Sequence, residues 1–396
     1  MRPRADLPVG GELVVMIPGN PWDGNRFGQH HVAARLAERV PVLWVDPQIS
    51  YLTPLNDAGA ARTLREDRLR VVAPNILRLS PITVPGVTRP VLREVALRQA
   101  RRAVRRAVEQ VGARVHSTVV ATLNDMLDVV PSAQRVFYGT DDFAAGGELM
   151  GTDPAWLARI ERRQLAKADV VVAVSPALQE KWSAQRPDVQ LIPNGCDAEH
   201  FAGADEAPLP ADVRLPGPIA GFVGHMSERI DLELLEAVAA SGVSLLLVGP
   251  RQPTFEIAKL DALLARANVQ WVGSKPFDEL PSYLRAIDVG LTPYRRSAFN
   301  HASFPLKTLE YLAAGRAAVV SDLPAHRWLD TPHVSIARTP LEFTDRTRAL
   351  LAGARRPEDV QARRALAARH SWEARTAELC RLLGLDGAQA PRSRAA

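Results

Sequence analysis

Residues 299–321 read FNHASFPLKTLEYLAAGRAAVVS and predict a loop, a helix, a turn and a short buried strand, in that order. Pro305 suits the first turn of the helix, because the N–H that it lacks would make no intrahelical bond there. The apolar residues that follow recur at helical spacing and define one face: Leu306, Leu309, Leu312 and Ala313. Gly315 can end the helix as a left-handed cap.

Two charged residues lie on this predicted helix. Lys307 falls in the first turn, beside N–H groups that attract anions. Glu310 follows one turn later and can accept hydrogen bonds from two sugar hydroxyls. The pair therefore suits the diphosphate and ribose of a nucleotide sugar. An ordinary amphipathic helix with a surface Lys–Glu pair would give the same pattern.

The same stretch carries a family resemblance. The pattern Pro-Leu-Lys-x-x-Glu-Tyr-Leu-Ala-x-Gly, followed by an apolar strand and Ser, resembles the nucleotide-sugar helix of GT-B glycosyltransferases of the family-4 type. It is closest to enzymes similar to the teichuronic-acid biosynthesis glycosyltransferases. The resemblance implies that Glu310 binds the ribose hydroxyls of the donor. Many relatives carry a second Glu eight residues earlier, near the transferred sugar, and this chain has Ala302 there.

Length and composition predict two globular domains. A chain of 396 residues with 46% hydrophobic and 23% charged residues exceeds one ordinary core. Its two cysteines, Cys196 and Cys380, lack metal-type spacing and suit a reducing cytoplasm. We recognise neither a signal peptide nor a membrane-spanning run. The net charge of +5 allows acidic ligands or a membrane surface without requiring either.

The N-terminal part begins with a predicted βαβ unit: a strand at 12–18, a loop at 19–28, a helix at 29–39 and a strand at 42–46. Such units form parallel sheets that bind ligands at the carboxyl ends of the strands. The loop lacks the G-x-G-x-x-G dinucleotide pattern. The resemblance implies an acceptor-side loop that contains Gly24, Asn25 and Arg26. A solvated loop remains the alternative for Arg26.

A basic helix is predicted at residues 91–111. Four of its arginines cluster on one face: Arg98, Arg101, Arg102 and Arg105. This face could dock on anionic lipid and would suit a lipid-linked acceptor. A merely solvated face is the competing interpretation.

Two aspartates follow a strand predicted at residues 135–139. Because Asp141 and Asp142 come just past its carboxyl end, they are expected to point into the ligand crevice. A carboxylate there could orient an acceptor hydroxyl or act as a base. An N-cap role for the segment that follows is the alternative.

Turn motifs mark the end of this part of the chain. Ser-Pro-x-Leu at 175–178 and Ile-Pro-Asn-Gly-x-Asp-x-x-x-Phe at 192–201 resemble the end of the N-terminal domain in family-4 enzymes. A linker is expected at residues 203–218.

A second βαβ pattern starts at residue 219. Gly224 ends its first strand, where a glycine lets backbone approach a ligand closely. The resemblance implies that His225 and Arg229 occupy positions where relatives neutralise the donor diphosphate, and the planar fork of Arg229 suits phosphate. The charge of His225 near neutral pH depends on its surroundings.

Another loop follows a strand predicted near residues 269–272. The resemblance implies that the backbone of Ser274, Lys275 and Pro276 holds the nucleobase. A plain strand-to-helix turn is the alternative.

Together these features predict an α/β protein of the GT-B class, with two Rossmann-like, doubly wound parallel-sheet domains facing a cleft. The expected domains are 1–205 for the acceptor, 206–370 for the nucleotide sugar, and a C-terminal helix and tail at 371–396 that cross back. The expected activity is retaining sugar transfer to a glycan, lipid-linked or small-molecule acceptor. Catalysis would rest on Arg229, Lys307 and Asp142, without a metal or other cofactor.

Other functions stay open at this point. A nucleotide-sugar epimerase on the same fold would need no separate acceptor. A non-catalytic scaffold would explain Ala302 and His225. Nucleic-acid binding is not expected, since the basic residues lack interleaved aromatics. We expect a cytoplasmic protein, with peripheral contact at the inner membrane face as an option.

Overall fold

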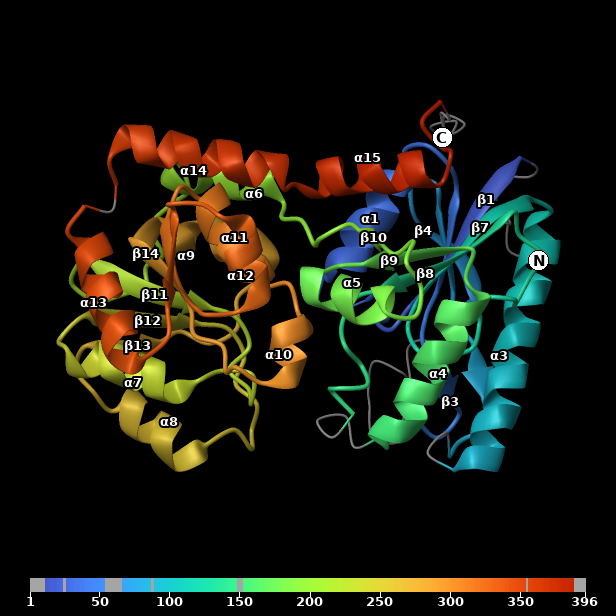
Figure 1. Cartoon of the computed structure of the whole chain (residues 1–396), viewed down its shortest axis with the longest axis horizontal. Helices are drawn as coiled ribbons and strands as arrows, with labels where there is room; N and C mark the ends of the chain where they lie inside the picture. The colour runs from blue at the N-terminus through green and yellow to red at the C-terminus, as the bar shows by residue number, and fades with distance from the viewer. Residues whose placement is uncertain are drawn as a thin grey trace. The chain divides into compact units, whose positions relative to one another are not determined.

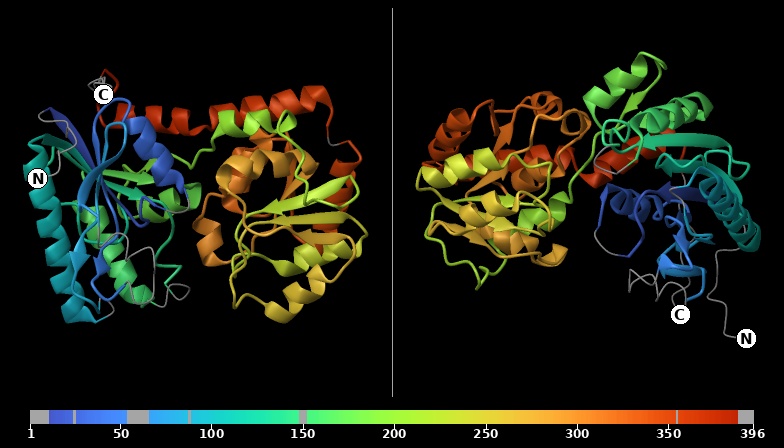
Figure 2. Two further views of the ribbon diagram at one scale, coloured as in Figure 1. Left: turned by 180° about the vertical axis from the view of Figure 1, so that it is seen from behind. Right: turned by 90° about the horizontal axis from the view of Figure 1, so that it is seen from below.

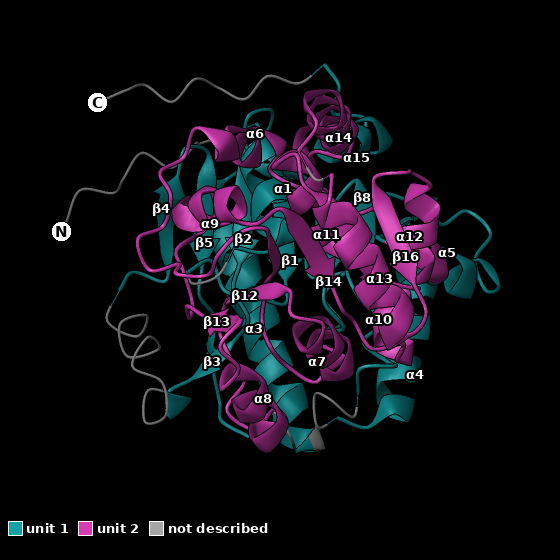
Figure 3. Ribbon diagram, turned by 90° about the vertical axis from the view of Figure 1, so that its left-hand side faces the viewer, with its two compact units in different colours: residues 1–174, 178–192, 375–396 teal, residues 175–177, 193–374 magenta. Residues whose placement is uncertain are grey.

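The computed structural model describes residues 11–23, 26–53, 66–86, 89–147, 152–353 and 355–387. The chain forms two compact units, which Figure 3 colours separately. Unit 1 comprises residues 1–174, 178–192 and 375–396, and unit 2 comprises residues 175–177 and 193–374.

Unit 1 is built on an eight-stranded sheet in the order β10-β9-β8-β7-β1-β2-β5-β4. All neighbouring strands are parallel except β4 and β5. The residues of β1 from Leu13 to Ile17 are all buried, as expected for a central parallel strand covered on both faces. The strands are β1 (Glu12–Pro18), β2 (Val42–Val45), β4 (Leu69–Ala73), β5 (Ile76–Leu79), β7 (Arg114–Ala121), β8 (Gln134–Gly139), β9 (Val170–Ala173) and β10 (Gln190–Leu191).

Helices and a small second sheet accompany these strands. The longest helix, α3 (Pro90–Val111), buries Val104, Ala107 and Val111 along one face. Gly112 ends it in the left-handed region at φ 68°. Unit 1 also contains α1 (Gly28–Leu36), α4 (Pro154–Lys167) and α5 (Pro176–Ser183), whose first residues belong to unit 2 (Figure 1). The strands β3 (Ile49–Ser50) and β6 (Ile82–Thr83) pair to form the small second sheet.

Unit 2 is built on a six-stranded, fully parallel sheet in the order β13-β12-β11-β14-β15-β16. In chain order this is 3-2-1-4-5-6, the doubly wound Rossmann arrangement. The order reverses between β11 and β14, and ligands of such sheets bind at the carboxyl ends of the strands there. The strands are β11 (Ile219–Val223), β12 (Ser244–Val248), β13 (Val269–Trp271), β14 (Val289–Thr292), β15 (Ala317–Ser321) and β16 (Val334–Ala337).

Helices cover both faces of this sheet (Figure 2). Alternate residues of β11 face opposite layers, with Ile219 and Val223 in one core cluster and Ala220 and Phe222 in the other. The first layer contains α6 (Ala198–Ala202), α9 (Leu280–Ala286), α11 (Leu306–Ala313), α12 (Pro324–Leu329) and α14 (Pro357–Arg369). The second contains α7 (Leu232–Ala240), α8 (Ile257–Leu264) and α13 (Pro340–Leu351). The last helix, α15 (Trp372–Leu382), belongs to unit 1 from Arg375 onward and matches the final helix expected from the sequence.

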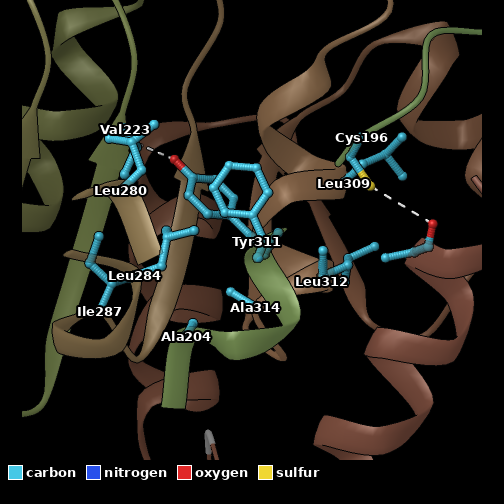
Figure 4. Packing of buried hydrophobic residues seen from close by; sticks show 14 of the residues in the cluster. Cys196, Ala204, Val223, Leu280, Leu284, Ile287, Leu309, Tyr311, Leu312 and Ala314 are labelled. Carbon is cyan, nitrogen blue, oxygen red and sulfur yellow. Dashed lines mark hydrogen bonds between the residues drawn. The ribbon is translucent and has the colours of Figure 1, made fainter. Parts of the chain in front are cut away.

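Tyr311 joins helix α11 to the two central strands of unit 2 (Figure 4). Its buried hydroxyl donates to the carbonyl of Leu291 at 3.1 Å and accepts from the N–H of Val223 at 2.9 Å. The ring packs so tightly on Gly290 that a Cβ there would lie 2.2 Å from Tyr311 Cγ. The helix is thus fixed over the point where the strand order reverses.

The structure confirms the helix and strand predicted within residues 299–321 and corrects two details. Gly315 has φ 77°, as a left-handed cap requires. The predicted loop at 299–304 is wrong in part, because Ser297 caps a short helix, α10 (Ala298–Ala302). Helix α11 also buries more than one face, since polar Thr308 and Glu310 are buried along with the leucines.

Candidate functional site

Arg229 lies at the point where the strand order of unit 2 reverses. It belongs to the loop after β11, and this loop pairs with the segment after β14 through an isolated bridge between Ile230 and Tyr294. The carbonyl of Arg229 accepts from the N–H of Arg295 at 2.9 Å. The fold therefore brings Arg229 to the edge where parallel sheets bind ligands.

Asn300, on α10, fixes the side chain of Arg229. Nε of Arg229 donates to Oδ1 of Asn300 at 2.9 Å, and Nδ2 of Asn300 donates to the carbonyls of Arg229 and Arg295, each at 2.9 Å. Asn300 is completely buried. The sequence did not single it out, because its contacts with Arg229 join residues 71 positions apart.

Two aromatic rings accompany the Arg229 guanidinium. Its Cζ lies 5.3 Å from the ring centre of Tyr294 and 5.0 Å from that of Phe299, both within cation–π range. Among the described residues, no hydrogen bond occupies its two terminal nitrogens. These nitrogens form a fork that can bind two oxygens of a phosphate.

Lys307 and Glu310 form an ion pair on α11. Nζ of Lys307 lies 2.8 Å from Oε2 and 3.2 Å from Oε1 of Glu310. The Glu310 side chain is 10% exposed and that of Lys307 is 25% exposed. The Lys–Glu pair considered as the alternative interpretation is thus present, and both groups lie near the start of the predicted nucleotide-sugar helix.

Glycines bring three loops of unit 2 together beyond the carboxyl ends of β11, β12 and β13. Gly249 has φ 136°, and a Cβ on it would lie 2.0 Å from the carbonyl oxygen of Gly224. Its N–H donates to the carbonyl of Gly273 at 2.8 Å. A side chain at residue 249 would prevent this approach, so glycine is required there.

The Lys275 side chain, in the predicted nucleobase loop, is paired with Asp212. Nζ of Lys275 lies 2.6 Å from Oδ2 of Asp212, and this hydrogen bond raises the pKa of Lys275 to about 12. Ser274 and Pro276 are exposed. Within the described ranges, no hydrogen bond satisfies the N–H groups of Ser274 and Lys275, which leaves backbone donors for a base.

A buried series of hydrogen bonds connects α11 to neighbouring elements of unit 2, and it was not predicted from the sequence. Thr292 and Thr308 hydroxyls lie 3.1 Å apart, Thr308 contacts Nε2 of His326 at 3.2 Å, and Nδ1 of His326 donates to the Ser321 carbonyl at 2.7 Å. Burial lowers the pKa of His326 to about 4, so the imidazole is neutral and can accept from Thr308. Both threonines and His326 are essentially unexposed.

Two positions where the sequence departs from the family pattern differ in their surroundings. Ala302 is buried at the end of α10, and its carbonyl accepts a hydrogen bond from the hydroxyl of Ser175. His225 is exposed.

The acceptor-side prediction concerns unit 1. Arg26 is exposed, whereas Gly24 and Asn25 lie outside the described residues. Oδ1 of Asp142 accepts from the N–H of Ala145 at 2.9 Å and from Nζ of Lys181 at 2.8 Å. The cap-like contact considered as the alternative is therefore present, although Oδ2 takes no hydrogen bond from another described residue. Asp141, next to it, lies in a bend after β8.

Unit 1 contains a buried network of its own, centred on Arg78, that was not predicted from the sequence. Arg78 is 2% exposed, and its guanidinium binds Oδ2 of Asp46 at 2.6 Å and Oδ2 of Asp23 at 2.5 Å. Burial lowers the pKa of Arg78, but the two carboxylates outweigh burial and raise it overall. An Asp directly after the buried strand 42–45 was the one available signal.

The basic face of α3 is only partly free. Arg101 binds the carbonyl of Asp125 at 2.7 Å and the carboxylate of Asp128 at 2.8 Å, and Arg105 binds the carbonyl of Val129 at 2.8 Å. Arg98 pairs with Glu94 at 3.2 Å, while Arg102 is exposed. Three of the four arginines of the predicted face, Arg98, Arg101 and Arg105, are thus paired within unit 1.

The described residues contain no group of three or more His, Cys, Asp or Glu side chains placed to hold a metal ion. In the same ranges, each helix is too short or too polar to cross a membrane.

Comparison with known proteins identifies the domain that carries this site. The model of the family described as "Glycosyl transferases group 1" matches residues 217–353. This part of unit 2 is therefore similar to the glycosyltransferase group 1 domains. Arg229, Lys307, Glu310 and the glycine-lined loops all lie within the matched residues.

Two relatives of known name are also similar to the chain in sequence. The chain is 32% identical over 181 residues to a putative teichuronic acid biosynthesis glycosyltransferase of Bacillus subtilis, and 29% identical over 183 residues to a GDP-mannose-dependent alpha-mannosyltransferase of Mycobacterium tuberculosis. These matches cover 44% and 45% of this chain, and in both cases the chain spans only 45% of the relative.

The solved structures show that the likeness in fold goes beyond the group 1 domain. Sucrose-phosphate synthase from Thermosynechococcus elongatus superposes with a TM-score of 0.72 at 18% identity, over 94% of this chain and 98% of that chain. The chain therefore has the GT-B fold predicted from its sequence.

Proposed function

We propose that this protein is a glycosyltransferase that moves a sugar from a nucleoside-diphosphate sugar to a glycan, lipid-linked or small-molecule acceptor. The observation that carries the proposal is the free guanidinium fork of Arg229 at the reversal of strand order in a group 1 domain. Both curated relatives are named as glycosyltransferases, and one name specifies GDP-mannose.

Unit 2 would bind the donor. The fork of Arg229 would hold the diphosphate, which gains negative charge as the glycosidic bond to it breaks, and Lys307 would neutralise a second oxygen. Glu310, released from Lys307, would accept hydrogen bonds from the ribose hydroxyls. The backbone at Gly224 would approach the phosphates closely. The N–H groups of Ser274 and Lys275, in the loop that ends at Pro276, would bind the base.

Unit 1 would bind the acceptor. Oδ2 of Asp142 would orient the attacking hydroxyl, while Lys181 and Ala145 hold Oδ1. Asp141, Gly24, Asn25 and Arg26 would complete that side. We further propose reaction without a metal ion, because two cationic side chains, Arg229 and Lys307, can stabilise the leaving group. Retention of the anomeric configuration is proposed from the family resemblance alone.

Membrane contact would use Arg102, which is exposed, and Arg98, which is exposed although it pairs with Glu94. Arg102 and Arg98 would add the electrostatic attraction to an anionic inner leaflet, about 1 kcal/mol for each basic residue near the surface. Arg101 and Arg105 would contribute less, since their guanidinium groups already bind carbonyls of unit 1.

The first test is thermal stability with UDP, GDP, ADP and TDP. A ligand at 100 times its dissociation constant adds about 2.7 kcal/mol to the folded state, which raises Tm by several degrees. We expect one diphosphate to raise Tm, and Arg229→Ala and Glu310→Ala to abolish the increase. If no diphosphate raises Tm, or if both variants keep the response, the donor site is wrong.

A second assay separates the competing activities. A transferase releases the nucleoside diphosphate from its nucleotide sugar when an acceptor is added. An epimerase would convert the nucleotide sugar without an acceptor, and a scaffold would do neither.

A further inference from the structure

We propose that Asp23, held by the buried guanidinium of Arg78, forms with Trp22 a subsite on unit 1 for a hydroxyl group of a carbohydrate. Arg78 and Asp46 are positioning residues for this subsite. The inference deepens the proposed function, because it places an uncharged sugar hydroxyl group of the acceptor at a named atom.

The topology of unit 1 places this subsite at a ligand-binding edge. The segment 19–23 follows the carboxyl end of β1, and β1 lies between β2 and β7 in the sheet. The chain passes from β1 to β2 and β5 on one side and then continues at β7 on the other, so the strand order reverses beside β1. Parallel sheets bind ligands at this point.

Two contacts hold the segment to the strands β2 and β5 or their ends, and a third holds it to helix α1. The N–H of Trp22 donates to Oδ1 of Asp46 at 2.8 Å, and the carboxylate of Asp23 accepts from Nη1 of Arg78 at 2.5 Å. The ring of His30 contacts the carbonyl of Pro21 at 3.1 Å. The segment is therefore preorganised, which reduces the entropy that a ligand must remove on binding.

The carboxylate of Asp46 uses all of its hydrogen-bonding capacity within the protein. Its Oδ1 also accepts from the indole of Trp44 at 3.1 Å, and its Oδ2 accepts from Nε of Arg78 at 2.6 Å and from the hydroxyl of Ser80 at 2.7 Å. With 5% exposure and four hydrogen bonds, this carboxylate has no capacity for a ligand. Its role is to fix the position of Trp22 and Arg78.

Asp23 differs because one of its oxygens is open. Only Oδ2 is held by Arg78, and within the described ranges Oδ1 takes no hydrogen bond. The side chain is 66% exposed. A carboxylate fixed through one oxygen presents the other as an acceptor, which suits a hydroxyl donor and repels phosphate or carboxylate ligands.

The neighbouring ring supplies the apolar side of such a site. Trp22 is half-buried and packs edge-on against Trp44, with centroids 5.2 Å apart and planes at 79°. The centroid of its ring also lies 5.6 Å from that of the His30 ring. A fixed indole beside an open carboxylate offers an apolar surface to the C–H groups of a sugar and an acceptor to its hydroxyls.

The subsite can be tested by NMR on ¹⁵N-tryptophan-labelled protein. The chain has seven tryptophans, and the indole signal of Trp22 is identified by its loss in Trp22→Phe. The probes are the methyl α-glycosides of glucose, galactose and mannose at concentrations up to 100 mM. We expect at least one to shift the Trp22 signal, and Asp23→Asn to weaken this binding at least tenfold.

Matched variants keep the result interpretable. Asp188 is also an Arg-paired aspartate with 60% side-chain exposure, so Asp188→Asn should leave the glycoside response unchanged. Arg78→Gln should weaken the response in a protein that still folds. If it does not fold, Asp23→Asn decides, because its exposed side chain can be changed without loss of packing.

The failure of this inference is distinct from failure of the proposed function. If no glycoside shifts the Trp22 signal, or if Asp23→Asn responds like the unaltered protein, the subsite is refuted even where a nucleoside diphosphate still stabilises the protein. Conversely, a Trp22 response without any nucleotide binding would support the subsite and refute the proposed transferase.

Discussion

Nε of Arg229 donates a 2.9 Å hydrogen bond to Oδ1 of Asn300, and this contact holds one edge of the guanidinium in place. The bond turns a flexible side chain into a fixed fork. A fixed fork loses less conformational entropy when it binds phosphate.

Asn300→Ala should therefore weaken binding of the recognised nucleoside diphosphate about tenfold, a loss of roughly 1.4 kcal/mol. Isothermal titration calorimetry measures the change. Asn268→Ala is the control, since Nδ2 of Asn268 also donates to two backbone carbonyls, those of Ala239 and Val243, each at 2.8 Å. Equal affinities for Asn300→Ala and the unaltered protein would contradict the positioning role.

The stability of the protein should fall on acidification because of His326. Burial lowers the pKa of this side chain from 6.5 to about 4, so the unfolded chain takes up a proton at a higher pH than the folded protein does. The stabilisation is fully present above pH 6.5 and is lost as the pH falls toward 4, on the order of 3 kcal/mol in all.

Urea denaturation between pH 7 and pH 4 measures this loss. His326→Gln should be less stable at pH 7 but should show a weaker pH dependence. His30 and His333, whose pKa values burial also lowers, remain in both proteins and cancel in the comparison. Parallel pH profiles for the two proteins would show that His326 is not the group that titrates.

Arg101 should matter for the stability of unit 1, whereas Arg102 should not. Arg101→Ala removes hydrogen bonds to two backbone carbonyls and to the carboxylate of Asp128, and we expect a cost of about 1–2 kcal/mol. Exposed Arg102→Ala should stay within about 0.5 kcal/mol of the unaltered protein. Thermal unfolding compares them, and an equal Tm for the two variants would be inconsistent with the contacts of Arg101.

Binding to anionic vesicles should show the opposite ranking for these two arginines. Arg102 is exposed and can meet the lipid, so its removal should reduce cosedimentation with phosphatidylserine vesicles. If neither variant changes the bound fraction, α3 does not contact the membrane.

Gly249→Ala should be far more damaging than Gly242→Ala. Both glycines have positive φ, 136° and 84°, but an added Cβ would lie 2.0 Å from the Gly224 carbonyl oxygen at Gly249 and would meet nothing within 4 Å at Gly242. We expect Tm to drop by about 10 °C or more for Gly249→Ala, and by a few degrees for Gly242→Ala. A similar drop for both would assign the effect to backbone strain alone.

The sequence could predict the fold because the signals are local. The strand 12–18, the buried face of α3 and the Gly315 cap each depend on residues within a few positions of one another. The short α10 was missed because aromatic and polar residues hide a single helical turn, which only the Ser297 cap indicates.

The candidate site was predictable only in part. Lys307 and Glu310 are three positions apart, so their proximity on a helix follows from its period. Asn300 and Arg229, or Arg78 and Asp46, meet only after the sheets have formed. For such pairs the sequence separation, 71 and 32 positions, removes any local signal.

The ion pair between Lys307 and Glu310 has a consequence for how a nucleotide arrives. While the site is empty, the two charges cancel, so this end of α11 exerts little long-range attraction on an approaching anion. The lysine becomes an effective cation only when the carboxylate turns to another partner. Capture would then proceed in two stages: an encounter governed by Arg229, followed by an exchange of partners on the helix. Ionic strength would slow the first stage more than the second.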